Sequence, residues 1–198
     1  NITILAMQNT MASTITGPMD VFAQTGIMYN YLAGQRPCPR FSTRLITTTG
    51  RPFKCLNGLR MIPDGSIHDA LDTDLILVSS IMDIDQTLAR QPEVIDWLKT
   101  CYSDGVRIAT VCSGAFVLAE TGLLNGKKAA THWALADRFK ARYPEIHLDP
   151  DSLVTDNGDL YCSGGFNAGI DLALYLVKKF AGAGIAGETA KTFLHDMG

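Results

Sequence analysis

The residues best suited to chemistry are a cysteine and a histidine that each follow a predicted strand. Cys112 lies in Val111-Cys112-Ser113-Gly114-Ala115, where an apolar run ends and a helical pattern begins with no residues left for a loop. A side chain at such a turn projects above the sheet, and the first amides of the helix point toward it. That environment favours a thiolate, so Cys112 is the candidate nucleophile; the alternative is a small core residue, which free cysteines commonly are.

His132 and Asp20 are candidate partners of this cysteine. His132 follows a possible short strand and would complete a nucleophile and base pair with Cys112, but the pattern alone favours a structural histidine bonded to backbone. We expect Asp20 in the first turn of a helix, where the helix dipole favours an acid; near the other two residues it would orient His132. No C-x-x-C pair and no zinc-finger spacing occurs, so no structural metal and no cofactor is expected.

A parallel sheet is the element expected to bring these residues together. Apolar runs predict strands at residues 2–7, 41–48, 74–78 and 106–111. The runs at 74–78 and 106–111 are continuous, which is typical of strands covered on both faces. One helix is expected to begin at residues 16–18, with Pro18 in its first turn, and another at Pro92. Further helices are expected over Ser113–Leu124, Ala134–Tyr143 and 170–177. Hairpins are expected at 51–62, around Asn57-Gly58, and at 153–163. The pattern predicts a flavodoxin-like α/β fold, a three-layer α/β/α sandwich with a mostly parallel sheet.

Length and composition predict a single domain over residues 1–198. The chain is 46% hydrophobic and 19% charged, which excludes disorder and coiled coil. Its formal net charge of −3 is far from the basic balance of a domain that neutralises many phosphates, so these residues alone are expected to bind nucleic acid poorly.

Two further features predict the compartment. The longest charge-free run, residues 1–19, contains too many polar side chains to cross a bilayer or to form a signal-peptide core, so no membrane partner is expected. The five cysteines are an odd number without paired spacing, which indicates free thiols in a reducing cytoplasm.

Several motifs taken together resemble one family over nearly the whole chain. They are residues 75–78, residues 108–124, Gly126, Thr131-His132-Trp133 and Ser163–Asp171, and they resemble the ThiJ/PfpI branch of the class I glutamine amidotransferase-like superfamily. Gly17–Phe22 and Gly169–Asp171 are similar to a subgroup, the amino-terminal half of AraC-type transcriptional regulators. The stretch Ala190–Asp196 resembles the point where such regulators continue, so the resemblance implies a helix-turn-helix domain that follows this chain and is absent from it.

The resemblance assigns roles residue by residue. Cys112 matches the family's nucleophile, His132 its nearby histidine, and Asp20 a second acid near that histidine. The acid that contacts the cysteine in enzymatic and redox-sensing relatives falls on Thr14 here, and a hydroxyl cannot shuttle a proton near neutral pH as a tuned carboxyl can. Relatives commonly have Pro-Gly-Gly where this chain has Ser79-Ser80-Ile81, and they use a backbone amide of that segment as an oxyanion donor. Both departures argue against efficient catalysis.

The resulting hypothesis is an effector-sensing domain whose catalytic constellation of Cys112, His132 and Asp20 is vestigial. A small polar metabolite, nitrogen-containing by the resemblance, would bind in a cleft at the strand ends, contacting Thr14, Ser80, Ile81, Ser113, Gly114 and Trp133. The resemblance implies a homodimer and DNA as a partner only through the missing domain. The alternative is a Cys-dependent hydratase or hydrolase of the isonitrile hydratase or glyoxalase-like type, and a redox sensor using Cys112 is a third.

Overall fold

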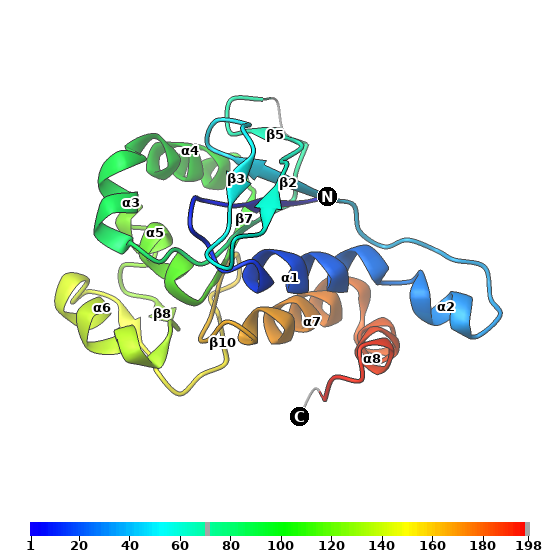
Figure 1. The fold of residues 1–198 in the computed structure, drawn as a ribbon. Coiled ribbons are helices and arrows are strands. Elements are labelled where there is room, and N and C mark those ends of the chain that lie inside the picture. Colours follow the sequence, from blue (N-terminus) through cyan, green and yellow to red (C-terminus); the bar gives the residue numbers. More distant parts are fainter. Residues whose placement is uncertain (70–71, 197–198) are drawn as a thin grey trace.

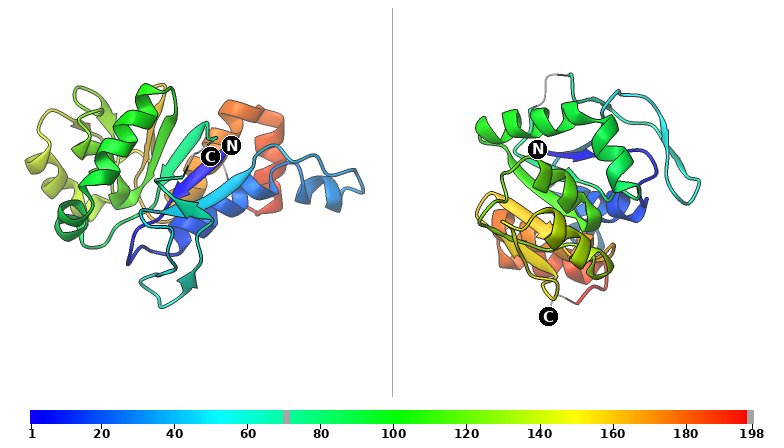
Figure 2. Two further views of the ribbon diagram at one scale, coloured as in Figure 1. Left: turned by 90° about the horizontal axis from the view of Figure 1, so that it is seen from above. Right: turned by 90° about the vertical axis from the view of Figure 1, so that its left-hand side faces the viewer.

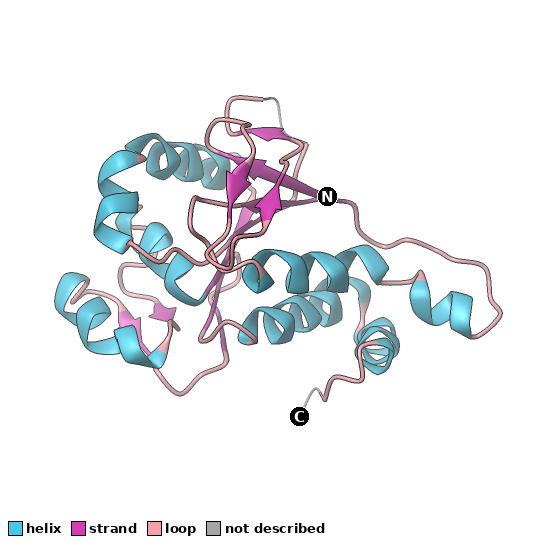
Figure 3. Cartoon of the chain, viewed as in Figure 1, coloured by secondary structure: helices cyan, strands magenta, loops and turns pink. Residues whose placement is uncertain are grey.

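The computed structural model describes residues 1–69 and 72–196, which form three layers with a sheet in the middle (Figure 1, Figure 3). The described strands of this sheet are β1 (Ile2–Leu5), β2 (Thr43–Thr47), β5 (Gly65–Ser66), β6 (Leu75–Val78), β7 (Arg107–Val111), β10 (Val154–Asp156) and β11 (Leu160–Ser163). Their spatial order is β10-β11-β7-β6-β1-β2-β5, and every pairing is parallel except that of β10 with β11. The predicted sandwich and its mostly parallel sheet are confirmed.

Helices cover both faces of the sheet, as Figure 2 shows from above. One layer contains α1 (Ser13–Gln24), α7 (Ala168–Ala181) and α8 (Ala183–Thr192), with the short α2 (Met28–Leu32) beyond them. The other contains α3 (Ile84–Arg90), α4 (Pro92–Ser103), α5 (Ala115–Glu120) and α6 (Ala136–Arg142). Within the described part of the chain, no helix combines the length and apolarity that crossing a bilayer requires.

The continuous apolar runs of the central strands reflect burial on both faces. Successive side chains of a strand point to opposite sides, so Ile4 packs in the same apolar cluster as Phe22 of α1, whereas Leu5 packs in the cluster of Phe116 of α5. All four strand residues of β1 are buried, as are those of β6. The coverage on both faces expected for β6 and β7 is confirmed, since each has buried residues in both apolar clusters.

The register of the central strands places their carboxyl ends at one edge. Leu5 of β1 pairs with Val78 of β6, and Val78 pairs with Thr110 of β7. The segments that follow β1, β6 and β7 therefore meet above the sheet, where open α/β folds usually bind ligands.

Two small sheets flank this edge. β3 (Phe53–Lys54) and β4 (Arg60–Met61) form the antiparallel hairpin predicted around Asn57-Gly58, where Gly58 has a φ of 89°. β8 (Lys128–Ala129) and β9 (His147–Leu148) pair in parallel on the other side of the molecule. The second predicted hairpin is also confirmed, as β10 and β11.

The first helix differs from its prediction. α1 begins at Ser13, and Pro18 lies inside the helix rather than in its first turn. The amides of Thr14 and Ile15 already bond to the carbonyl oxygens of Met11 and Ala12, so a turn forms before the proline. Proline is favoured in the first turn of a helix, but it does not require the helix to begin there, and in this chain the helix begins about one turn earlier.

Other differences concern helices that the apolar pattern did not indicate. α3 and α8 were not predicted, because α3 buries only Ile84 and α8 consists largely of small residues with a weak apolar face. The helix expected over Ser113–Leu124 is shorter: α5 ends at Glu120, although its residues Ala115 to Ala119 are all buried, as expected.

Candidate functional site

Cys112 lies at a sharp turn where β7 ends and a short 3₁₀ turn, η1 (Cys112–Gly114), precedes α5. Its φ is 57°, in the left-handed region that non-glycine residues rarely adopt and that persists only where the surroundings hold it. Gly114 permits the close packing around it, because a Cβ there would lie 2.7 Å from the carbonyl oxygen of Ser79 and 2.8 Å from that of Val78. The predicted strand-to-helix elbow is confirmed.

The thiol of Cys112 is enclosed, and only 1% of the residue is exposed. Burial raises the pKa of the Cys112 thiol to about 11, while hydrogen bonds from Ser113 act in the opposite direction and are outweighed. The group is therefore a neutral thiol near pH 7. The prediction that the elbow favours a thiolate is therefore wrong. Loss of hydration disfavours the charged form of Cys112 more than the neighbouring hydrogen-bond donors stabilise it.

Next to the elbow, buried hydroxyls join the start of α1 to the loop after β6. The Thr14 hydroxyl donates to the carbonyl oxygen of Met11 at 2.7 Å, so it acts as an acceptor toward Ser80. It accepts from the backbone amide of Ser80 at 3.2 Å and lies 3.0 Å from the Ser80 hydroxyl. Thr10 donates to the Ser79 hydroxyl at 3.1 Å. We call Thr10, Thr14, Ser79 and Ser80 the hydroxyl cluster.

Ser113 connects the elbow to the same loop. Its hydroxyl accepts from the amide of Ile81 at 2.9 Å and donates to the carbonyl oxygen of Ile81 at 2.6 Å. The amide of Ser79 bonds to the carbonyl oxygen of Leu5 at 3.0 Å, and that of Ser80 bonds to Thr14. All three amides that follow β6 thus have internal acceptors, and none of them is available to stabilise an oxyanion.

His132 lies at the outer side of the site and is half-buried. It caps the 3₁₀ turn η2 (Trp133–Leu135), where its Nδ1 accepts from the amide of Ala134 at 3.2 Å, so Nε2 carries the proton in the neutral ring. The preceding residue, Thr131, donates to the carbonyl oxygen of Cys112 at 3.0 Å. This bond places the histidine segment against the elbow, but among the described residues no hydrogen bond joins His132 to Cys112.

Aromatic rings surround the imidazole. The ring centroid of His132 lies 5.5 Å from that of Trp133 and 5.4 Å from that of Phe166, which belongs to the loop after β11. Trp133 is 75% exposed, whereas the residues of the hydroxyl cluster are fully buried. The site therefore has a buried polar interior and an exposed aromatic rim, which we define as His132, Trp133 and Phe166.

Asp20 does not lie where it was expected. α1 has no acid in its first turn, and Asp20 lies past the middle of this 12-residue helix, exposed to solvent. The described side-chain hydrogen bonds include none from Asp20 to His132. The prediction failed because it depended on the helix start: a start at Ser13 moves Asp20 two turns away from the amino end.

Thr10, Thr131 and Phe166 were not among the predicted site residues. Thr10 precedes Thr14 by one helical repeat, and Thr131 directly precedes His132, so proximity in sequence to a predicted residue is the signal that could have found both. Phe166 lies in the motif Ser163–Asp171, but the sequence did not indicate that its ring contacts His132. Among the described residues, no group of three or more His, Cys, Asp or Glu side chains could hold a metal ion.

The sequence matches the model of a known family over most of its length. The model of the DJ-1/PfpI family matches residues 1–179. The chain belongs to the DJ-1/PfpI family. Two similar solved structures have the same fold. One is an AraC family transcriptional regulator from Pseudomonas putida, with a TM-score of 0.82 and 20% identity, which covers 97% of this chain and 98% of the regulator chain. The other is Drosophila melanogaster DJ-1beta, with a TM-score of 0.77 and 20% identity, which covers 98% of this chain and 97% of the DJ-1beta chain.

Two relatives found by sequence are of different kinds. The HTH-type transcriptional regulator CdhR of Pseudomonas aeruginosa is 29% identical over 150 residues, which cover 76% of this chain and 44% of the regulator. Isonitrile hydratase of Pseudomonas putida is 30% identical over 174 residues, which cover 87% of this chain and 68% of the enzyme. The chain thus spans less than half the length of the regulator it resembles.

Proposed function

We propose that this DJ-1/PfpI chain is the effector-sensing part of an AraC-family transcriptional regulator and that it binds a small polar metabolite without converting it. The observation that carries the proposal is the internal use of the Ser79, Ser80 and Ile81 amides, which removes the oxyanion donors expected from this loop. Losing one such donor lowers turnover in other enzymes by about 10²- to 10³-fold. Similarity to the regulator CdhR supports the sensing role.

The neutral thiol supports the same conclusion. A thiol with a pKa of about 11 supplies little thiolate near neutral pH, and the thiolate is the nucleophilic form. Thr14 occupies the position of the family's acid, but its hydroxyl is bonded to Met11 and to Ser80 and cannot take up a proton as a carboxylate does. The catalytic roles suggested for Cys112, His132 and Asp20 therefore fit a vestigial constellation.

We infer that the ligand enters at the aromatic rim. Trp133 offers an exposed indole ring, and Nε2 of His132 offers a proton for a hydrogen bond. Ser113, Gly114, Ile81 and the hydroxyl cluster are buried, and the bond from Thr131 to the carbonyl oxygen of Cys112 ties the segment of the rim to the elbow. A polar, nitrogen-containing molecule suits the mixture of ring faces and hydroxyl groups.

DNA and a second copy of the chain are the proposed macromolecular partners of the whole protein. With a net charge of −3, residues 1–198 lack the excess of cations that DNA binding needs, so we assign contact with DNA to a further domain. A two-fold operator would suit a homodimer. In a gel-shift titration at physiological salt, this chain alone is expected to show no specific retardation; specific nanomolar binding would overturn the assignment.

Binding by the chain can be tested with free amino acids, their amides and simple amines as calorimetric probes. We expect at least one probe to bind saturably, Trp133→Ala to weaken that binding by about tenfold or more, and Cys112→Ala to weaken it by less than about tenfold, roughly 1.4 kcal/mol. Tyr31→Ala is the matched control, because it removes an exposed aromatic ring on α2, at the opposite end of the molecule (Figure 1). Equal weakening by Tyr31→Ala, or no binding of any probe, contradicts the proposal.

The second candidate function is a Cys-dependent hydratase, which the similarity to isonitrile hydratase favours. The two functions are separated by assaying the wild-type chain for isonitrile hydration and for methylglyoxal consumption. We expect neither. Turnover that is present in the wild type and lost in Cys112→Ala would show an enzyme, because removing a covalent nucleophile abolishes nearly all activity.

A further inference from the structure

A hollow opens at the same edge of the sheet, at the carboxyl ends of β1 and β2. It has a volume of about 250 Å³, slightly below the usual range of roughly 300–1,000 Å³ for small-molecule pockets, which suits a small ligand. Its lining includes Gln8, Thr47, Thr48, Arg51 and Gln91. None of its lining residues belongs to the elbow, the hydroxyl cluster or the aromatic rim.

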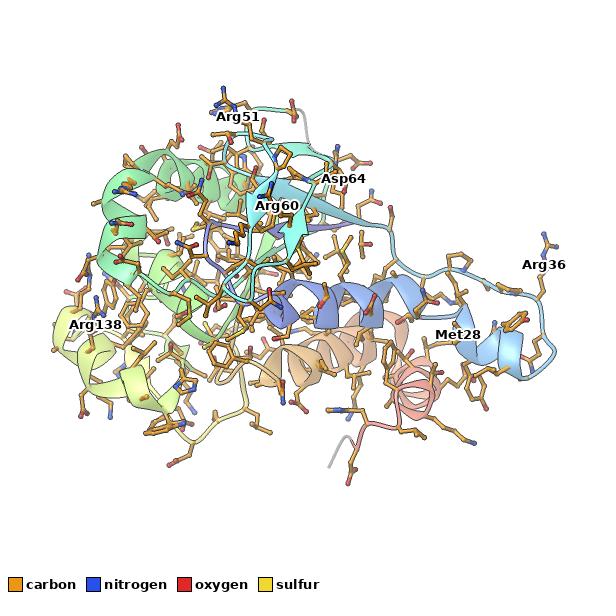
Figure 4. The ribbon with its side chains drawn as sticks, viewed as in Figure 1. Met28, Arg36, Arg51, Arg60, Asp64 and Arg138 are labelled. Carbon is orange, nitrogen blue, oxygen red and sulfur yellow. The ribbon has the colours of Figure 1, made fainter. Side chains whose placement is uncertain are left out.

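The hairpin of β3 and β4 gives this region a positive charge. A neighbouring hollow of about 260 Å³ shares Gln8, Pro52 and Phe53 with the first and is also lined by Asn9, Lys54 and Arg60. The two hollows thus contain the cations Arg51, Lys54 and Arg60, and no acid lines either of them. Figure 4 shows Arg51 and Arg60 on this part of the chain.

These cations have no anionic partner within the described residues, since none of the ion pairs there includes Arg51, Lys54 or Arg60. Asp64, the next acid along the chain, has its carboxylate bonded to the amide of Leu45 at 2.8 Å. A guanidinium beside a hollow without an acid is suited to bind a carboxylate or a phosphoryl group.

Polar groups on the floor of the hollow are already oriented. The Thr48 hydroxyl donates to Oε1 of Gln91 at 2.7 Å, which leaves the Nε2 amide group of Gln91 as a donor. The Thr47 hydroxyl accepts from the amide of Gly50 at 3.0 Å and keeps its own proton to donate. Thr47 and Thr48 are both buried, so these donors are held by the fold and not by mobile surface side chains.

The walls are tied together by backbone hydrogen bonds. The amide of Asn9 donates to the carbonyl oxygen of Lys54 at 3.2 Å, and that of Leu56 donates to the carbonyl oxygen of Thr10 at 2.9 Å. The hairpin is therefore fixed to the loop that follows β1, and the hollow between them is preformed. Preformed donors bind a ligand with a smaller entropic penalty than groups that must first be ordered.

We propose that this hollow is a second binding site of the chain, which takes a small metabolite through a carboxylate or phosphoryl group. Arg51 supplies the charge and a planar pair of donors, and Thr47 and Gln91 supply neutral hydrogen bonds. The site does not depend on Cys112 or on the aromatic rim, so it stands whether or not the proposed sensing function is correct.

The probes that test the site are succinate and inorganic phosphate, each titrated calorimetrically at constant ionic strength. We expect saturable binding of at least one of them, and the stronger of the two identifies the chemical source of the anion. Arg51→Gln is expected to weaken binding by at least tenfold, and Arg51→Lys by less, because it retains the charge but loses the planar pair of donors. Arg36→Gln is the matched control, an equal loss of charge on the exposed loop after α2, far from the hairpin (Figure 4).

Amide chemical shifts locate the binding. Titration should move the signals of Thr48 and Gly50 and leave those of Gly114 and Thr131, at the Cys112 site, unchanged. Overlapping circular dichroism spectra and melting curves of the variants exclude unfolding as the cause of lost affinity. The proposal is overturned if neither probe binds saturably, if Arg36→Gln weakens binding as much as Arg51→Gln does, or if the shifts occur at Gly114 and Thr131.

Discussion

The hydroxyl of Ser113 bonds to both backbone groups of Ile81, accepting from its amide at 2.9 Å and donating to its carbonyl oxygen at 2.6 Å. This pair connects the turn after β7 to the loop after β6 and holds the elbow closed. It also engages the Ile81 amide, which the proposed function counts among the oxyanion donors that this chain lacks. One serine thus both stabilises the strand edge and engages this amide.

Replacing this serine tests the first of these effects. Ser113→Ala leaves the buried amide and carbonyl of Ile81 without their partner, and we expect it to lower the free energy of unfolding by about 1–3 kcal/mol. Urea unfolding followed by circular dichroism measures the change. Ser103→Ala is the control, because its hydroxyl donates to the carbonyl oxygen of Lys99 at the exposed end of α4, and its effect should stay within about 0.5 kcal/mol. Equal losses in the two variants would show that the hydrogen bonds to Ile81 contribute no more to the free energy of unfolding than one exposed hydrogen bond at a helix end.

The thiols should react in an order set by exposure. Cys38 is exposed, whereas Cys112 is buried and burial raises its pKa, so iodoacetamide near neutral pH is expected to modify Cys38 first and Cys112 only slowly or after unfolding. Mass mapping of digests after timed labelling gives the order. Labelling of Cys112 ahead of Cys38 in the folded protein would mean that the elbow opens readily and exposes its sulfur.

The raised pKa of Cys112 also predicts how stability depends on pH. An unfolded thiol with the ordinary pKa of 9.0 loses its proton before the folded one, whose pKa is about 11. Between these values the unfolded state binds fewer protons, so the free energy of unfolding falls as the pH rises, by up to about 1.4 kcal/mol per pH unit from this group. Cys112→Ser, which does not titrate there, should show a shallower decline from pH 9 to 11.

Cys38→Ser is the control for this experiment, because it makes the same chemical change at an exposed position. Its stability should follow the wild-type curve over the same range of pH. Parallel curves for the wild type and Cys112→Ser would contradict the raised pKa.

The elements that could be predicted from the sequence are those whose signal is local. Continuous apolar runs identified β1, β6 and β7, and the Asn57-Gly58 turn identified its hairpin. The elbow was also predictable, since a strand and a helix that adjoin leave only a sharp turn for Cys112. These features depend on neighbours in the chain, which a sequence displays directly.

The environment of the site was harder to predict because distant segments create it. The burial of Cys112 depends on the loop after β6 closing over the elbow, through Ser113 and Ile81, which are 32 positions apart. The prediction of a thiolate was based on the helix start alone and did not include this loss of hydration. Asp20 was misplaced for a related reason, since a helix boundary displaced by three residues moves every residue relative to the amino end.

Gly114 gives the most direct test of how the elbow packs. A Cβ at this position would lie 2.7 Å and 2.8 Å from two carbonyl oxygens of the backbone, Ser79 and Val78, which cannot move as a flexible side chain can. Gly114→Ala must therefore separate the elbow from the end of β6, and we expect a loss of about 3 kcal/mol or more in the free energy of unfolding. Because the hydroxyl cluster and Ser113 would lose their alignment, Cys112 in this variant should also react faster with iodoacetamide.

Gly187→Ala is the matched control for that variant. Gly187 lies in α8, and a Cβ added there would have no neighbouring atom within 4 Å, so alanine meets open space and should stabilise the helix by about 0.5–1 kcal/mol relative to glycine. The same chemical change thus has opposite expected signs at two positions, decided only by the atoms around them. If Gly114→Ala were as stable as the wild type and kept Cys112 unreactive, the close contact between the elbow and β6 could not be what buries the thiol.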